Sequence, residues 1–122
     1  MKEFLYHYRV YPETARVIDG DTVEITIDVG FKQTSRWIIR FYAIDAPELR
    51  GVDKEEKASG LMSKAFVQHW FTEAAQPGRP KMYLHTIGKQ DSFGRWMGIF
   101  EYDGVSLNDL LLKENYAEPY KS

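Results

Sequence analysis

The chain has 122 residues, a formal net charge of −2 and no cysteine, and 43% of its residues are hydrophobic. This length and composition predict one globular domain, expected over residues 1–122, with a core that needs no covalent cross-links. The absence of cysteine excludes disulfides and thiolate metal sites. An isoelectric point near 5.9 argues against a broadly basic nucleic-acid surface, although not against a local basic cleft.

The sequence contains no apolar run of about 18 residues, the length that a membrane-spanning helix requires, and no apolar leader typical of a secretory signal. We therefore expect no membrane partner. We also expect a monomer. A cytoplasmic protein and a processed secreted form would look alike at this level, so the compartment stays open.

Alternating apolar and polar residues predict strands in the first third of the chain. Their segments are 4–10, 15–18, 21–27 and 36–44. The first two are read as one strand interrupted by Pro12 and Glu13. Asp19-Gly20 is a strong hairpin signal between this strand and the next. Strands joined by such short turns predict an antiparallel meander.

The second part of the chain begins with a charged, glycine-containing stretch, after which apolar residues recur at helical spacing. The predicted elements are a loop over 49–59, a helix from Leu61 to residue 75, strands over 81–87 and 95–102, and a helix from Ser106 to Asn115, followed by a tail. A helix between the third and fourth of five strands is typical of a Greek-key OB-fold barrel. We expect that mainly β (α+β) fold with two to three helices, and keep a sandwich fragment as the alternative.

Carboxylates and arginines gather at the predicted strand ends and turns. They are Asp19, Asp21, Arg40, Asp45, Glu48, Asp91 and Arg95. Carboxylates hold hard cations and orient water, and arginines neutralise phosphoryl charge, so the set favours water attack on a phosphodiester. No P-loop or His-pair metal motif is present. We expect each of His7, His69 and His85 to be a packed or surface residue rather than a ligand.

Each of these motifs alone is compatible with an ordinary turn, and their combination carries the functional hypothesis. The segments 17–22 (Val-Ile-Asp-Gly-Asp-Thr), 40–48 (Arg through Asp-Ala-Pro-Glu) and 91–95 (Asp through Gly-Arg) occur in this order. This combination resembles the thermonuclease family, typified by staphylococcal nuclease, over residues 15–117. Residues 108–117 also resemble the last helix of that family.

The resemblance implies an OB-fold endonuclease that uses Ca²⁺ to hydrolyse DNA and RNA phosphodiesters and leaves 3′-phosphate ends. By that similarity the calcium ligands are Asp21, Asp45 and the backbone carbonyl of Ala46. Glu48 is implied as the general base for the attacking water. The implied phosphate clamp is Arg40 with Arg95. The implied supporting carboxylates are Asp19 and Asp91.

This chain departs from the family pattern at three positions of the implied site. Ala46 replaces a threonine, which preserves a carbonyl ligand but loses a hydroxyl. Ser92 and Phe93 replace a lysine and a tyrosine that contact phosphate, so we expect these substrate-binding positions to contact a terminal phosphate more weakly. Tyr116 and Tyr120 receive no role. The acidic isoelectric point predicts weaker binding to long nucleic acid.

Two other functional classes compete with a nuclease. One is a non-catalytic OB-fold module that binds single strands or a protein ligand, and the other is a small structural domain with incidental polar turns. The full set of metal-ligating carboxylates, arginines and a general base favours the nuclease, since a binding module needs no base. Preference for DNA or RNA, and for single or double strands, stays open.

Overall fold

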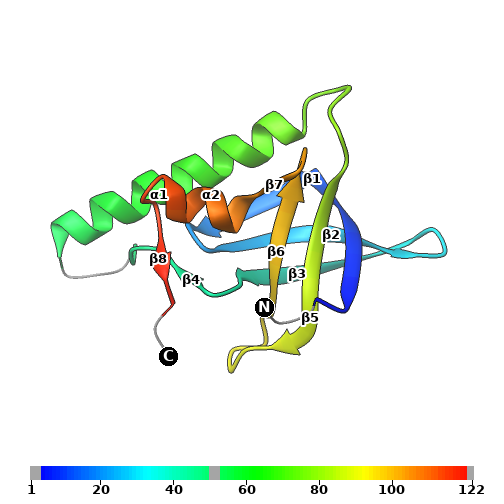
Figure 1. The fold of residues 1–122 in the computed structure, drawn as a ribbon, viewed down its shortest axis with the longest axis horizontal. Helices are drawn as coiled ribbons and strands as arrows, with labels where there is room; N and C mark the ends of the chain where they lie inside the picture. The colour runs from blue at the N-terminus through cyan, green and yellow to red at the C-terminus, as the bar shows by residue number, and fades with distance from the viewer. Residues whose placement is uncertain (1–3, 50–52, 121–122) are drawn as a thin grey trace.

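Strands precede, separate and follow two helices in the computed structural model, which describes residues 4–49 and 53–120 (Figure 1). The elements are β1 (Tyr6–Asp19), β2 (Thr22–Gly30), β3 (Gln33–Phe41), β4 (Ile44–Asp45), α1 (Lys54–Ala74), β5 (Met82–Gln90), β6 (Trp96–Tyr102), β7 (Val105–Ser106), α2 (Leu107–Lys113) and β8 (Glu118–Pro119). The structure is therefore mainly β, as the sequence predicts.

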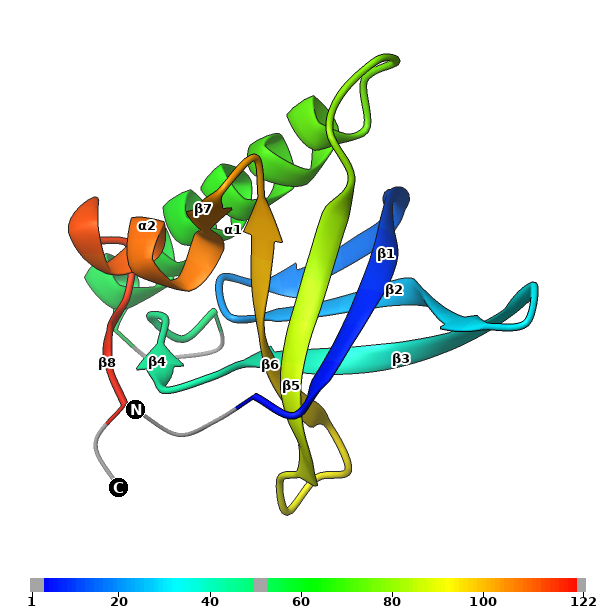
Figure 2. The ribbon, with the colours of Figure 1, turned by 45° about the vertical axis from the view of Figure 1, so that its right-hand side comes forward.

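Five of these strands close into a barrel (Figure 2). Antiparallel pairing joins β1 to β2, β2 to β3, β1 to β5 and β5 to β6. Parallel pairing of β3 with β6 completes the ring. Because α1 lies between the third and fourth barrel strands, the order of elements is that of an OB-like barrel, and the prediction of this fold is confirmed. The sandwich alternative is wrong, since the β3–β6 pairing closes the five strands into one barrel, and the second sheet among the described residues is only the short β4–β8 pair.

The interruption predicted at Pro12 is a register shift within one strand, and β1 continues through it from Tyr6 to Asp19. The register against β2 shifts between Tyr11 and Arg16, where a proline is tolerated because the ladder is already broken. Thr14 bridges this stretch: its hydroxyl donates to the Tyr11 carbonyl at 2.6 Å and accepts from the Thr26 amide at 3.0 Å.

The third predicted strand divides in two, and the predicted tail is partly a strand. β3 ends at Phe41, since Ala43 has a φ of 64°, which β structure does not allow. The short β4 that follows pairs antiparallel with β8. The Tyr120 amide also donates to the Ala43 carbonyl at 2.9 Å. This contact brings the C-terminal segment beside the end of β3.

Helix α1 begins at Lys54, seven residues before the predicted start, so most of the predicted loop is helical. Asp53 caps it by accepting a hydrogen bond from the Glu55 amide at 2.9 Å. Gly60 lies inside this helix for a packing reason, because a Cβ there would lie 2.8 Å from the Pro47 carbonyl oxygen. Residues 50–52 of the predicted loop lie outside the described residues.

The later elements match their predictions closely. β5 extends three residues beyond the predicted end, to Gln90, and β6 begins at Trp96. Ser106 caps α2 as predicted, accepting a hydrogen bond from the Asp109 amide at 3.2 Å. Across residues 4–49 and 53–120, neither helix combines the length and apolar character that a membrane crossing requires.

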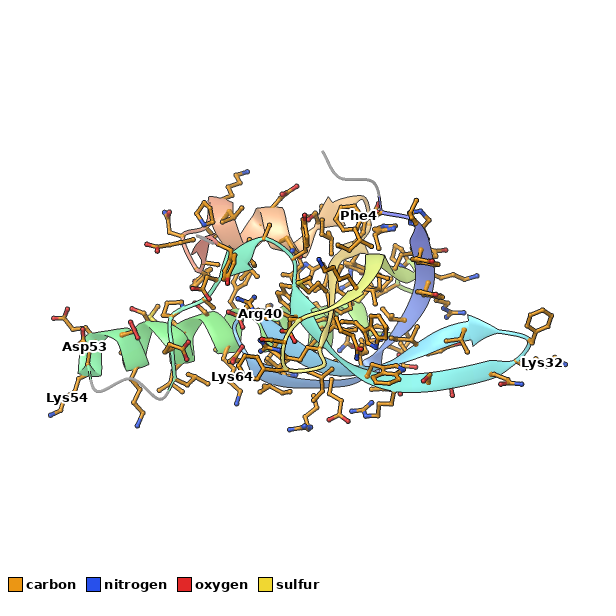
Figure 3. All side chains as sticks on the ribbon, turned by 90° about the horizontal axis from the view of Figure 1, so that it is seen from below. Phe4, Lys32, Arg40, Asp53, Lys54 and Lys64 are labelled. Carbon is orange, nitrogen blue, oxygen red and sulfur yellow. The ribbon has the colours of Figure 1, made fainter. Side chains whose placement is uncertain are left out.

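The hydrophobic core fills the barrel and continues under α1. Phe41, Phe71 and Phe100 are each no more than 1% exposed, and their rings meet edge to face, with centroids 5.4–5.5 Å apart. Figure 3 shows the two ends of the molecule, Asp53 and Lys54 on α1 and Lys32 on the β2–β3 hairpin, with Arg40 between them. Phe41 and Phe100 thus anchor β3 and β6 in the core next to the position of Arg40.

Candidate active site

A polar pocket of about 500 Å³ opens where four separate segments of the chain meet. Its walls are Asp19, Asp21, Arg40, Asp45, Ala46, Pro47, Glu48, Phe93 and Arg95. These residues come from the β1–β2 turn, the end of β3, the β4 segment and the β5–β6 turn. The structure therefore brings together eight of the ten residues that the sequence nominates.

Arg40 joins the two carboxylates that the resemblance assigns to calcium. Its Nη2 atom lies 3.1 Å from Oδ1 of Asp45 and 3.5 Å from Oδ2 of Asp21. The other terminal nitrogen donates to the Phe41 carbonyl at 3.0 Å. With its side chain only 12% exposed, the guanidinium is held at the wall of the pocket by contacts to three oxygen atoms.

Asp21 is buried and has a partner for each of its carboxylate oxygens. The Ala46 amide donates to Oδ2 at 2.8 Å, and the Thr22 hydroxyl donates to Oδ1 at 2.9 Å. The Asp21 amide donates in turn to Oδ1 of Asp19 at 3.1 Å. Thr22 belongs to the 17–22 motif but is not among the predicted site residues. Its hydroxyl, directly after an aspartate in a turn, was the available signal.

Burial divides the charge unequally between the two neighbouring aspartates. It raises the pKa of Asp19 to about 6, and the hydrogen bond and negative charge of Asp21 add to the rise. Burial also acts to raise the pKa of Asp21. The hydrogen bond with Asp19, the Arg40 guanidinium and the Ala46 amide outweigh that effect and hold this pKa below its ordinary value. Asp21 therefore stays ionised, and Asp19 is the member of the pair that takes up a proton.

Gly20 lets the β1–β2 turn approach the helix and the β4 segment closely. A Cβ at this position would lie 2.7 Å from Cβ of Ser63 on α1 and 2.8 Å from Cβ of Ala46. Its φ is not positive, so turn geometry alone does not require glycine. The Asp-Gly signal correctly places the hairpin. The physical reason for the glycine is tertiary packing, which holds Asp21 against Ala46.

Asp91 organises the β5–β6 turn and aims Arg95. Its Oδ1 accepts the amides of Phe93 at 2.9 Å and Arg95 at 3.0 Å, and its Oδ2 accepts Nε of Arg95 at 2.7 Å. Gly94 completes the turn with a φ of 80°. The Arg95 guanidinium lies 5.4 Å from the centroid of the Phe93 ring, which is 82% exposed at the rim of the pocket.

Replacing Asp91 with asparagine should lower the free energy of unfolding at neutral pH by about 1–3 kcal/mol, since an amide cannot accept all three bonds. Burial acts to raise the pKa of Asp91, but the amides of Arg95 and Phe93 and the Arg95 guanidinium hold it below its ordinary value of 3.8. A lowered pKa stabilises the fold above the unfolded pKa. The wild-type advantage should therefore shrink as the pH falls below about 4. Urea unfolding between pH 3 and 7 measures it, and equal stabilities at pH 7 would contradict the role.

The other residues considered in the sequence analysis lie inside, beside or away from this pocket. Glu48 is exposed and lines the pocket, where no side chain among the described residues forms a hydrogen bond with it. Ser92 does not line this pocket but an adjoining one of about 200 Å³, which Tyr120 also lines. Tyr116 stacks on Phe66 with ring centroids 4.5 Å apart, so it belongs to the packing.

The donor set of the pocket suits a hard cation. It offers four carboxylates and two guanidinium groups, so the excess charge is negative. No group of three or more histidine or acidic side chains in residues 4–49 and 53–120 is arranged around one metal position. A cation here would therefore depend on the two carboxylates beside Arg40 together with the Ala46 carbonyl, all of them oxygen donors of the kind that Ca²⁺ prefers.

Comparison with known proteins finds distant similarity. An uncharacterized protein of Methanocaldococcus jannaschii is 22% identical over 133 residues. The alignment covers 95% of this chain and 62% of the archaeal protein, so this chain spans less than two thirds of that relative. No family model matches the sequence.

Proposed function

We propose that this protein is a calcium-dependent nuclease that hydrolyses phosphodiester bonds of DNA and RNA. The observation that supports it is the single pocket lined by Asp21, Arg40, Asp45, Glu48 and Arg95. These residues span 75 positions of sequence, and local turn formation has no reason to gather them. Their types match those of the thermonuclease motifs, which are the basis for naming the reaction.

The charge of the pocket supports the dependence on a metal ion. Four carboxylates and two arginines repel an incoming phosphodiester unless a cation first offsets the excess. Asp21, Asp45 and the Ala46 carbonyl would hold Ca²⁺, which when bound supplies positive charge to the phosphate oxygens and lowers the pKa of nearby water. The Arg40 contacts to both aspartates keep these ligands at one wall of the pocket.

The other residues act on the water and the phosphate. Glu48, exposed in the pocket, accepts a proton from the attacking water as the new P–O bond forms. Arg40 and Arg95 donate hydrogen bonds to phosphate oxygens, whose negative charge grows in the transition state. The bond from phosphorus to the 5′-oxygen breaks, the leaving oxygen takes a proton, and a 3′-phosphate remains. Asp91 is a positioning residue for Arg95.

Incubation with denatured DNA should yield oligonucleotides that end in 3′-phosphates when Ca²⁺ is present and no cleavage when a chelator is added. Phosphatase treatment followed by labelling of the ends identifies which end carries the phosphate. Retention of DNA without cleavage would instead identify a non-catalytic OB-fold module. Equal cleavage with chelator would contradict the role of calcium.

A further inference from the structure

Two histidines face one another on the outside of the barrel, and neither lines the candidate active-site pocket. His7 on β1 and His85 on β5 are direct cross-strand partners in the antiparallel register. Their Nδ1 atoms lie 2.7 Å apart, and their ring planes are inclined at 67°. Figure 2 shows β1 and β5 running side by side, with β6 beyond them. The pairing therefore fixes two imidazoles that are 78 residues apart in the sequence.

A third residue determines which nitrogen of His85 carries the proton. Nε2 of His85 lies 2.6 Å from Oε1 of Glu101 on β6. A carboxylate accepts hydrogen bonds, so Nε2 is protonated and Nδ1 of the neutral ring keeps its lone pair. His7 then donates its Nδ1 proton to Nδ1 of His85. Because His7 is exposed, its proton can move to Nε2 when Nδ1 takes another partner, at the cost of the hydrogen bond to His85.

We infer that His7 and His85 form a second metal site, for a transition-metal dication of the Zn²⁺, Ni²⁺ and Cu²⁺ class. Both rings would bind through Nδ1, replacing the shared proton by the metal. The contact from Glu101 to the far nitrogen of His85 is the arrangement that commonly orients metal-bound imidazoles. Nitrogen ligands favour these ions over Ca²⁺, so this site differs in chemistry from the pocket around Arg40.

The spacing of the two nitrogens is close to what such ions need. Two metal–nitrogen bonds of about 2.0–2.1 Å separate their nitrogens by about 2.9 Å in a square-planar cis arrangement and about 3.3 Å in a tetrahedral one. From the present 2.7 Å, the nitrogens must separate slightly, and the rings must turn so that both lone pairs point to one metal position. Glu101 offsets part of the charge that a metal ion would add. Arg9, which lies on β1 two residues after His7, stacks on a different residue: its guanidinium is 4.9 Å from the centroid of the Tyr11 ring.

The proposal departs, for His7 and His85, from the expectation that each histidine is a packed or surface residue rather than a metal ligand. A metal held by β1 and β5 would link two barrel strands that are joined only by hydrogen bonds and packing. Since an ion that binds only the folded state stabilises it, Zn²⁺ should raise the melting temperature.

The test uses the whole chain, freed of metal with a chelator and titrated with Zn²⁺ at pH 7.5. Two-bond ¹⁵N–¹H spectra of the histidines report each ring nitrogen separately. We expect one equivalent of Zn²⁺ to shift Nδ1 of His7 and His85 and to leave His69, an exposed histidine on α1, unchanged. Before zinc is added, His85 should show the tautomer protonated at Nε2. Zinc bound only in the acidic pocket would leave both histidines unshifted and would overturn the proposal.

Calorimetric titration of matched variants measures the affinity. His7→Ala and His85→Ala should each weaken zinc binding at least about tenfold, and Glu101→Ala about 10–100-fold, the range for partners of metal-bound histidines. His69→Ala should bind as the wild type does. Circular dichroism confirms that each variant is folded. Equal affinities of wild type, His7→Ala and His85→Ala would show that the pair is a hydrogen-bonded cross-strand contact only.

Discussion

Turnover of denatured DNA should fall by about 10²–10⁴-fold when Glu48 is replaced by glutamine, while the fold stays unchanged. Glutamine keeps the size of the side chain but has no basic oxygen to take a proton from water. Because Glu48 is exposed and forms no hydrogen bond with a described residue, its substitution removes no contact that stabilises the barrel. The loss should therefore appear in kcat rather than in the melting temperature.

The control for this experiment is Glu118→Gln. Glu118 on β8 is also exposed and lines a neighbouring cavity with Glu48, but it does not line the pocket of Arg40. Its substitution changes the net charge equally and should leave turnover within about twofold, as expected for an exposed charge outside the site. If Glu48→Gln also retains turnover within about tenfold of the wild type, Glu48 is not the general base.

Calcium affinity should fall at least about tenfold in Asp21→Asn, and turnover should fall with it, since a neutral amide is a poor replacement for an ionised ligand. The low pKa of Asp21, maintained against burial by Asp19, Arg40 and Ala46, keeps this carboxylate charged at neutral pH in the wild type. Isothermal titration with Ca²⁺ gives the affinity. Unchanged affinity would remove Asp21 from the ligand set.

A second measurement separates this loss from a loss of folding. Ca²⁺ should raise the melting temperature of the wild type, and further in the presence of a nucleotide bisphosphate, because both ligands bind the folded state. Asp21→Asn should melt cooperatively without that increase. The control Asp103→Asn changes an exposed turn aspartate whose φ of 54° asparagine also tolerates, and it should keep the calcium effect.

Local sequence patterns predict the barrel well because its strands follow simple rules. Alternation over 21–27 and the Asp19-Gly20 signal place β2 and the first hairpin correctly. The predictions failed where a distant contact overrides the local pattern. The predicted helix starts after Gly60, whereas α1 includes this glycine, which packs closely against the Pro47 carbonyl. The predicted tail becomes β8 only because β4 offers an edge to pair with.

The candidate site was also predicted only in part from the sequence. Residue types and their order nominate the carboxylates and arginines, since turns at strand ends display polar groups. Ser92 was nominated for the same pocket, but the turn places it in the adjoining one. The histidines show the limit most clearly, because nothing near His7 in the sequence indicates that His85 and Glu101 will complete a chain of contacts with it.

The sequence by itself determined the class of fold, the positions of most strands and helices, and the set of charged residues available for chemistry. These follow from periodicity and residue type, which act over a few neighbouring positions. The tertiary structure alone decided that Arg40 contacts Asp21 and Asp45, that Gly20 packs against Ala46, and that two histidines meet across β1 and β5. The reason is physical: closing the barrel sets strand register and distances at once, and no local stretch of chain encodes them.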